Sequence, residues 1–310
     1  MKISKSLRGS LLLLLTALIW GISFVSQSEG GDSVGPFSFN GMRMVIGALA
    51  LIPVIRMLDK LGFSPKKPAS DADKKKLLKG GLVCGVIMFV ASNLQQVGMY
   101  FGTNAGKAGF LTAVYILIVP ILGLFMKKKC GINVWIAVGI TLVGLYLLCI
   151  TDGFSFAASD LIVLLCALAF AFHIVVVDSL SPVIDGVRLS CLQFLIGGLL
   201  TMIVSAAVEI APMGFPAWIA QFGTRTALIS LSYSAFMSCG VAYTLQIIGQ
   251  DGVDPTIASL LMSLESVFAV LGAWVILGEA LTTRELVGCV IIFAAIILAQ
   301  VDLKKITVRS

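Results

Sequence analysis

The chain has 310 residues, 58% of them hydrophobic and only 12% charged, with a formal net charge of +6. This apolar excess excludes a water-soluble globule and a disordered chain. A membrane helix needs about 20 mostly apolar residues to cross ~30 Å of hydrocarbon. Ten stretches meet this requirement, so the sequence predicts an all-α integral membrane protein with ten transmembrane helices. In chain order they run approximately from Leu11 to Val25, Phe37 to Leu58, Gly80 to Val97, Ala108 to Met126, Val134 to Ile150, Ala158 to Val177, Leu189 to Ala207, Ala227 to Ile248, Ile257 to Leu277, and Leu286 to Val301.

Lysines and arginines indicate how the predicted helices cross the membrane, because positively charged loops stay on the cytoplasmic side. With a cytoplasmic N-terminus, 18 of the 22 fall on the inner side, and only Lys107, Arg225 and Arg284 fall on the outer side. We therefore expect both termini to be cytoplasmic. The basic stretch from Lys66 to Lys79 lies in a short loop, where topology and anionic lipid explain its charge, so nucleic acid is not an expected partner.

Hydropathy divides the ten spans five and five near residue 155, which predicts an internal repeat. At an offset of 150 residues Tyr115 in the first half faces Glu265 in the second. Because five crossings are an odd number, the second copy begins on the opposite side of the membrane, and the repeat is inverted. We expect two five-helix domains, residues 1–155 and 156–310. Inverted halves can alternate between inward-open and outward-open arrangements around a central site, which indicates transport.

Glu265 is the deepest acidic residue in the predicted spans, and no basic residue lies within a helical turn of it. A charged side chain inside the membrane is costly and needs a partner or a wet cavity. Glu265 could bind a cationic or amine-bearing substrate, or carry a proton whose loss is coupled to transport. The alternative is a protonated, structural glutamate that hydrogen-bonds to a neighbouring helix.

Two further sets of polar residues occur at similar places in both halves. Asn93 and Gln96 in the third span, and Tyr243 and Gln246 in the eighth, are i, i+3 pairs that share a helical face. Their placement indicates a common cavity lining, with ordinary hydrogen bonding between helices as the alternative. Tyr115 in the fourth span adds a polar group to this set.

Four more side chains in or beside the spans need an interpretation. Trp20 in the first span either lines the cavity or serves as packing or an interfacial anchor. His173, the only histidine, could shuttle protons or contact a neighbouring helix. We expect Arg43 to have a structural role, bonding helix-end carbonyls near the outer boundary. Lys107 begins the fourth span, where it could recognise an anion or simply reach water.

Other features of the chain favour a structural interpretation. Gly139 and Gly144 in the fifth span and Gly288 in the tenth allow close helix packing, with a dimer face as an option. The seven cysteines have no Cys-x-x-Cys spacing, and nothing resembles a nucleotide loop, a Ser/His/Asp set or a metal cluster. We therefore expect no cofactor, no metal and no enzymatic activity.

Several motifs resemble the EamA-type branch of the drug/metabolite transporter superfamily. They are Thr16 to Val25 with Phe37 to Arg43, Asn104 to Ala113, Pro255 to Ala269, and Leu277 to Thr282, which contains a Leu-Gly-Glu sequence. The resemblance implies two inverted five-helix repeats around a cavity formed mainly by spans one, three, four, six, eight and nine. Carried over, it implies a substrate-binding set of Trp20, Asn93, Gln96, Tyr115, His173, Tyr243, Gln246 and Glu265.

Two positions depart from the family pattern. Ser266 stands where the family often has proline, and Lys107 stands where a small or amide residue is more usual. A cation at the outer mouth would favour anionic cargo.

Together these observations predict a secondary transporter of small organic metabolites, such as amino acids or drug-like solutes. It would act by alternating access in the bacterial inner membrane, more readily as an exporter than as an importer. Its expected partners are a small-molecule substrate, with proton coupling as an option, and the lipid bilayer, with the protein as a monomer or homodimer. The alternatives are a membrane-embedded enzyme acting on a lipid-linked substrate and a channel-like scaffold.

Overall fold

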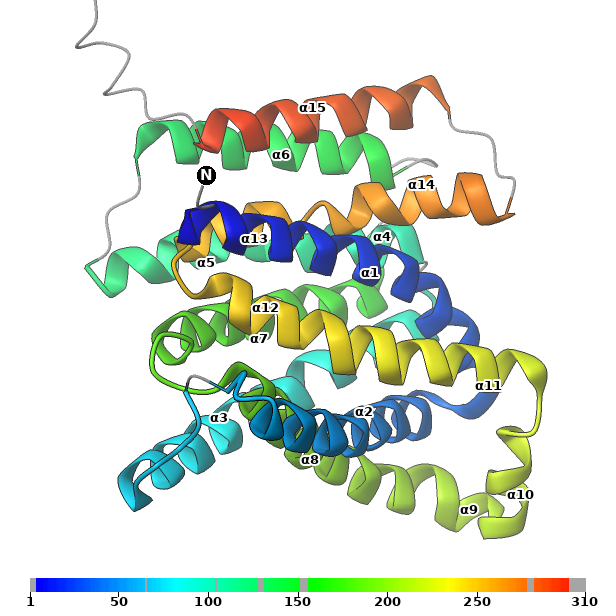
Figure 1. The fold of residues 1–310 in the computed structure, drawn as a ribbon. Helices are drawn as coiled ribbons and strands as arrows, with labels where there is room; N and C mark the ends of the chain where they lie inside the picture. Colours follow the sequence, from blue (N-terminus) through cyan, green and yellow to red (C-terminus); the bar gives the residue numbers. More distant parts are fainter. Residues whose placement is uncertain are drawn as a thin grey trace, which may run out of the picture.

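The computed structural model describes residues 4–64, 66–103, 105–127, 131–150, 156–277 and 282–300. Within these ranges it contains helices and turns but no strand, and the long helices run side by side (Figure 1). Residues 278–281 of the Leu-Gly-Glu motif, the boundary near residue 155 and the end of the tenth predicted span lie outside the described residues.

Each predicted span corresponds to a helix or to a run of helices. The first five are α1 (Lys5–Val34), α2 (Pro36–Lys60), α3 (Asp71–Tyr100), α4 (Ala105–Ala113) followed by α5 (Tyr115–Phe125), and α6 (Ile132–Cys149). The other five are α7 (Ala158–Leu180); α8 (Gly186–Ser205) with η1 (Ala206–Ile210) and α9 (Ala211–Met213); α11 (Arg225–Ser232) with η2 (Tyr233–Ala242) and α12 (Tyr243–Gln250); α13 (Pro255–Met262) followed by α14 (Glu265–Leu277); and α15 (Thr283–Gln300). A short helix, α10 (Phe215–Gln221), precedes α11.

The described part of the chain has eight helices or helix runs that are long and apolar enough to cross a membrane, and a shorter apolar one at Pro255–Leu271. The prediction of an all-α integral membrane protein is therefore confirmed. Because each half has five crossings, α7 begins at the end of the bundle opposite to that of α1. The two halves are thus inverted relative to each other.

Polar residues before the helices satisfy the amide groups of the first turn. At the start of α3, the Ser70 hydroxyl accepts a hydrogen bond from the Asp73 amide, and the Asp73 carboxylate accepts one from the Ser70 amide, both at 3.1 Å. This reciprocal capping supplies partners that the first helical turn lacks. Asp185 caps α8 in a similar way, through the Arg188 amide at 3.0 Å.

The fourth span of each half is broken at an equivalent place. One break separates α4 from α5 at Val114, and the other separates α13 from α14 at 263–264. At both breaks the chain tightens, because the amides of Val114 and Leu264 bond the carbonyl three residues earlier at 3.3 Å. Tyr115 and Glu265, which align at the offset of 150 residues, are consequently the first residues of the half-helices α5 and α14.

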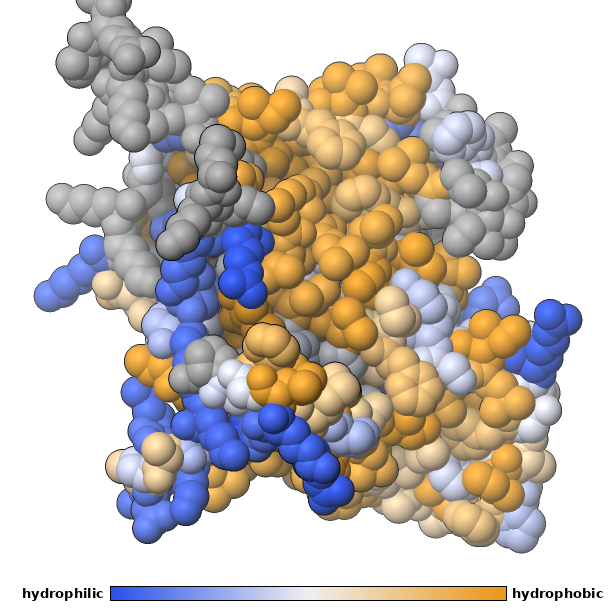
Figure 2. Space-filling view, in the orientation of Figure 1, coloured by the Kyte–Doolittle hydropathy of each residue, from blue (hydrophilic) through white to orange (hydrophobic). Residues whose placement is uncertain are grey.

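Hydrophilic and apolar surfaces separate along the bundle. The start of α1 and the end of α15 lie at the same end of the molecule, on the left of Figure 1. Hydrophilic side chains gather at that end in Figure 2, while the middle of the visible face is apolar. An apolar belt between polar ends is the surface that a bilayer requires. The left end is the one that the lysine and arginine count predicts to be cytoplasmic.

α6 and α15 pack against each other through glycine (Figure 1). A Cβ atom added at Gly288 would lie 2.8 Å from the Gly144 carbonyl oxygen and 2.9 Å from the Leu148 nitrogen. Both are backbone atoms, which cannot move aside as a flexible side chain can. At Gly139, also in α6, an added Cβ would meet nothing within 4 Å. The predicted structural role therefore fits Gly144 and Gly288, whereas Gly139 has open space.

We expect Gly288→Ala to destabilise the protein by about 1–3 kcal/mol, the usual cost of overpacking. The matched variant Gly139→Ala should be neutral or should gain up to about 1 kcal/mol, because alanine is the better helix former. Unfolding midpoints in detergent, measured under identical conditions, give the comparison. Equal shifts in the two variants would contradict this account of the α6–α15 contact.

Candidate functional site

A cavity lies between the helices of the two halves. Water-sized molecules can occupy about 40 Å³ of it. Its lining comes from α1, α2, α3, α4, α5, α7, η2, α12, α13 and α14. These are the six spans expected to form it, with the addition of the second span. This space holds only a few water molecules and is smaller than typical small-molecule sites of about 300–1,000 Å³, so a solute would enter only when the helices move apart.

Five of the eight predicted site residues line this cavity. They are Trp20, Tyr115, Tyr243, Gln246 and Glu265. They come from four different spans of both halves, so the fold brings together side chains that are far apart in the sequence.

Asn93 and Gln96 are not among the lining residues. Asn93 accepts a hydrogen bond from the Asn40 amide at 2.9 Å and donates one to the Thr201 hydroxyl at 2.7 Å. The Gln96 amide donates to the Gln27 carbonyl at 2.9 Å. Both residues therefore make the hydrogen bonds between helices that were the alternative interpretation of this pair.

His173 also lies outside the lining and is fully buried. Its Nε2 is 2.9 Å from the side-chain oxygen of Gln193 on α8, and its ring meets Tyr243 edge-on at 6.2 Å between centroids. The histidine thus connects α7 to α8, and its ring packs against Tyr243, which lines the cavity. Its contact with a neighbouring helix is the commoner of the two roles considered for a lone membrane histidine.

Glu265 and Tyr115 meet across the interface between the halves. The Tyr115 hydroxyl donates a hydrogen bond of 3.4 Å to the Glu265 carboxyl, and both side chains are buried. Among the described residues, Glu265 forms no ion pair. Its position at the first residue of α14 places it at the positive end of a helix, which favours a carboxylate. The acid is therefore held in the cavity without a cationic partner in the described part of the chain.

Two polar atoms of the cavity lining lack a partner in the described chain. They are the indole Nε1 of Trp20, a donor, and the side-chain oxygen of Gln246, an acceptor. The Trp20 ring lies 4.5 Å from that of Tyr243 between centroids, so an aromatic wall adjoins these groups. Buried polar groups normally find a partner, and a solute in the cavity could supply it.

Several lining residues were not in the predicted site. Gln27 and Gln95 are both lining residues, and the Gln95 amide donates to the Thr112 hydroxyl at 3.0 Å. Gln95 directly precedes Gln96 in the sequence, so only the rotation of α3 decides which of them faces the cavity. Arg43, expected to bond helix-end carbonyls, lines the cavity as well, and its Nε donates to the Asn40 oxygen at 2.9 Å. The signal for Arg43 was its charge within a span.

Lys107 does not present a free cation at the outer mouth. Its ammonium pairs with the carboxylate of Asp160 at 2.5 Å, and that carboxylate also accepts from the Thr103 hydroxyl at 2.9 Å. Asp160 is almost fully buried, so the pair is shielded from water. A residue of the other half therefore balances the charge of Lys107, and the preference for anionic cargo expected from it stays a prediction.

At the predicted cytoplasmic end, α1 and α12 cross in close contact. A Cβ atom added at Gly249 would lie 3.0 Å from the Gly9 carbonyl oxygen and 3.1 Å from a side-chain carbon of Leu13. A second, larger pocket, in which water-sized molecules can occupy about 600 Å³, lies at the same end, with Gly9, Lys5 and Lys66 in its lining.

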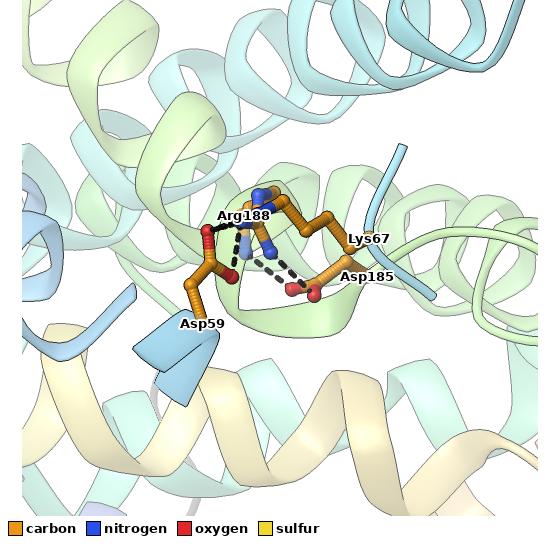
Figure 3. Close-up of polar contacts among 4 residues, drawn as sticks. All are labelled: Asp59, Lys67, Asp185 and Arg188. Carbon is orange, nitrogen blue, oxygen red and sulfur yellow. Dashed lines mark hydrogen bonds and ion pairs between the residues drawn. The ribbon is translucent and has the colours of Figure 1, made fainter. Parts of the chain in front are cut away.

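Ion pairs join the two halves around this pocket. Asp251 of the second half pairs with Lys5 at 2.8 Å and with Lys66 at 2.5 Å. Burial alone would raise the pKa of Asp251, but the hydrogen bonds from Lys5 and Lys66 outweigh it and lower that pKa. Nearby, Arg188 of the second half bonds both oxygens of Asp59 at 2.6 and 2.7 Å (Figure 3).

Figure 3 also shows the neighbours of this pair. Asp185 accepts a hydrogen bond from Arg188 at 2.8 Å, and Lys67 lies 3.1 Å from Asp59.

No group of three or more His, Cys, Asp or Glu side chains that could hold a metal ion occurs in the described ranges.

Known proteins resemble this chain over nearly its whole length. An uncharacterized transporter from Archaeoglobus fulgidus is 28% identical over 304 residues, which cover 96% of this chain and 87% of that protein. The uncharacterized transporter YoaV from Bacillus subtilis is 23% identical over 291 residues, covering 92% and 94%. A solved crystal structure has a TM-score of 0.75 at 17% identity and covers 94% of this chain and 96% of its own, which supports the fold alone.

The family comparison agrees with these relatives. Residues 7–150 and 157–300 each match the EamA-like transporter family, so that two copies of the family unit follow one another in the sequence. The two matches together cover most of the 310 residues. The chain therefore belongs to the EamA-like transporter family.

Proposed function

We propose that the protein is a secondary transporter that exports a small organic solute, such as an amino acid or a drug-like molecule, across the bacterial cytoplasmic membrane. The observation that carries this proposal is the cavity between two inverted halves, with the Glu265 carboxyl in its lining and no cationic partner beside it among the described residues. Membership of a transporter family supports the same conclusion.

In this proposal Glu265 binds either the amine of the solute or a proton. A solute amine supplies the cation that the carboxylate lacks, while Tyr115 holds the carboxyl in place. When the solute leaves, a proton takes over that role, because an unpaired carboxylate in a membrane cavity is costly. Competition between the two cations would couple solute export to proton entry. Trp20 and Gln246 would hydrogen-bond the solute through their unpartnered atoms.

Alternating access would come from rocking residues 1–155 against residues 156–310. In this proposal the Gly9–Gly249 crossing and the ion pairs of Asp251 would close the predicted cytoplasmic end. At the opposite end, the Lys107–Asp160 pair also joins the two halves. Movement to an inward-open state would break the first set of contacts and keep the second, since each set lies at a different end of the cavity.

In the same proposal both termini are cytoplasmic, the protein needs no cofactor, and it is not an enzyme. Its partners are the solute and the bilayer, and it works as a monomer or a homodimer. A membrane-embedded enzyme would instead turn over a lipid-linked substrate in purified form. A channel-like scaffold would instead conduct without saturation.

Glu265→Gln tests the coupling role. The variant should lose the stimulation of transport by a pH gradient and should bind amine-bearing cargo about 10- to 100-fold more weakly, because a charge-assisted hydrogen bond is lost. Proteoliposome flux at several pH values measures both effects. The control Glu29→Gln changes an exposed acid near the C-terminal end of α1, and it should behave like the wild type. If Glu265→Gln transports normally at every pH, Glu265 does not couple.

Asp251→Asn tests the closure of the cytoplasmic end. Loss of its two ion pairs should speed hydrogen–deuterium exchange of residues 4–13 and 247–253 about fivefold, since partly exposed pairs contribute up to ~1 kcal/mol. The control Asp71→Asn removes an exposed pair with Lys74 within one helix and should leave exchange unchanged. Unaltered exchange in Asp251→Asn would show that these pairs do not hold the end closed.

The same contacts should be insensitive to pH near neutrality. Because the pKa of Asp251 is lowered in the folded protein, its contribution is present above the usual carboxyl pKa of ~3.9 and is lost only as pH falls through the lower folded value. Exchange of the two segments, corrected for intrinsic rates, should therefore match at pH 5 and pH 8. A marked increase at pH 5 would point to a different titrating group.

A further inference from the structure

We infer that Arg43 binds an anionic group of the cargo, so that the transported solute carries a carboxylate. This inference rests on the transport function proposed above and adds a second recognition element to the cavity. Arg43 is the eighth residue of α2, is only 3% exposed, and belongs to the same cavity lining as Glu265.

A chain of hydrogen bonds holds the guanidinium in place. Arg43 Nε donates to the Asn40 oxygen at 2.9 Å, and the Asn40 amide donates to the Asn93 oxygen at 2.9 Å. Asn93 in turn donates to the Thr201 hydroxyl at 2.7 Å, which anchors the chain on α8. Asn93, predicted as a binding residue, is therefore a positioning residue that acts through Asn40.

The outer nitrogens of the guanidinium have no hydrogen-bond or acidic partner among the described residues. Asn40 occupies only one of the five N–H groups of the side chain. Bonds to helix-end carbonyls, the structural role expected from the sequence, do not occur for Arg43 in the described ranges. A buried charge in a membrane protein is costly, and arginine cannot lose its proton to remove that charge, so a buried guanidinium needs an anion.

A carboxylate matches the two outer nitrogens of this guanidinium best. Two parallel N–H groups can bond both oxygens of a carboxylate, a geometry that a single point charge does not provide. Arg43 and Glu265 share the cavity but form no ion pair with each other. Opposite charges kept apart in one cavity are complementary to a solute that carries both an amine and a carboxylate.

Matched pairs of solutes test this inference. The probes are α-amino acids and their primary amides, which keep the amine and the side chain and replace the carboxylate by a neutral group. We expect wild-type protein in proteoliposomes to bind the acids at least about tenfold more tightly than the amides in counterflow competition, equivalent to ~1.4 kcal/mol. Arg43→Gln should abolish this ratio and leave amide affinity within about twofold.

Two further variants separate recognition from folding. Arg56→Gln removes an exposed arginine near the other end of α2 and should keep the wild-type ratio. Arg43→Lys keeps the charge without the planar fork and should give an intermediate ratio, which also serves if Arg43→Gln does not fold. Thermal unfolding of each variant shows whether the helix bundle is intact.

The outcomes are distinct from those that test the transport function. Wild-type protein that binds acids and amides equally, or an Arg43→Gln variant that keeps the ratio or weakens both probes alike, would overturn the role of Arg43 while transport stands. If the wild type shows no saturable exchange of any solute, the proposed transport function itself fails.

Discussion

The cost of placing polar and charged groups in hydrocarbon is the constraint on which this structure depends. The chain meets it in three ways. Most lysines and arginines stay outside the spans, and polar side chains within the spans pair with one another, as Asn93 does with Asn40 and Thr201. The remaining groups, above all Glu265 and Arg43, face a cavity. A solute is then the natural partner for what the protein leaves unpaired.

The inverted repeat explains how the site is assembled. Breaks at equivalent places in the two halves bring Tyr115 and Glu265 to the start of half-helices that meet at the interface. One copy contributes a neutral hydroxyl and the other an acid, so equivalent positions in the two halves carry different groups. The second break forms although Ser266 stands where the family often has proline. The tightened turn at Leu264 is therefore enough to interrupt the helix without a proline there.

Much of the fold followed from the sequence, because apolar length and loop charge are local signals that do not depend on packing. The helix of each predicted span and the acid in the cavity lining were predicted this way. The rotation of each helix was not, because in a membrane helix nearly every position is apolar and periodicity says little about the inner face. For that reason Gln95 lines the cavity rather than Gln96, and His173 faces α8. The partner of Lys107 was also missed, because Asp160 is 53 residues away in the other half.

The central claim is that solute crosses by alternating exposure of one cavity between two halves. Counterflow in proteoliposomes tests it most directly, with purified protein, vesicles preloaded with a mixture of unlabelled metabolites, and the same metabolites isotopically labelled outside. The account predicts saturable accumulation of a few labelled solutes that depends on the internal pool. Flux that rises linearly with concentration and ignores the internal pool, or no flux of any solute, would contradict it.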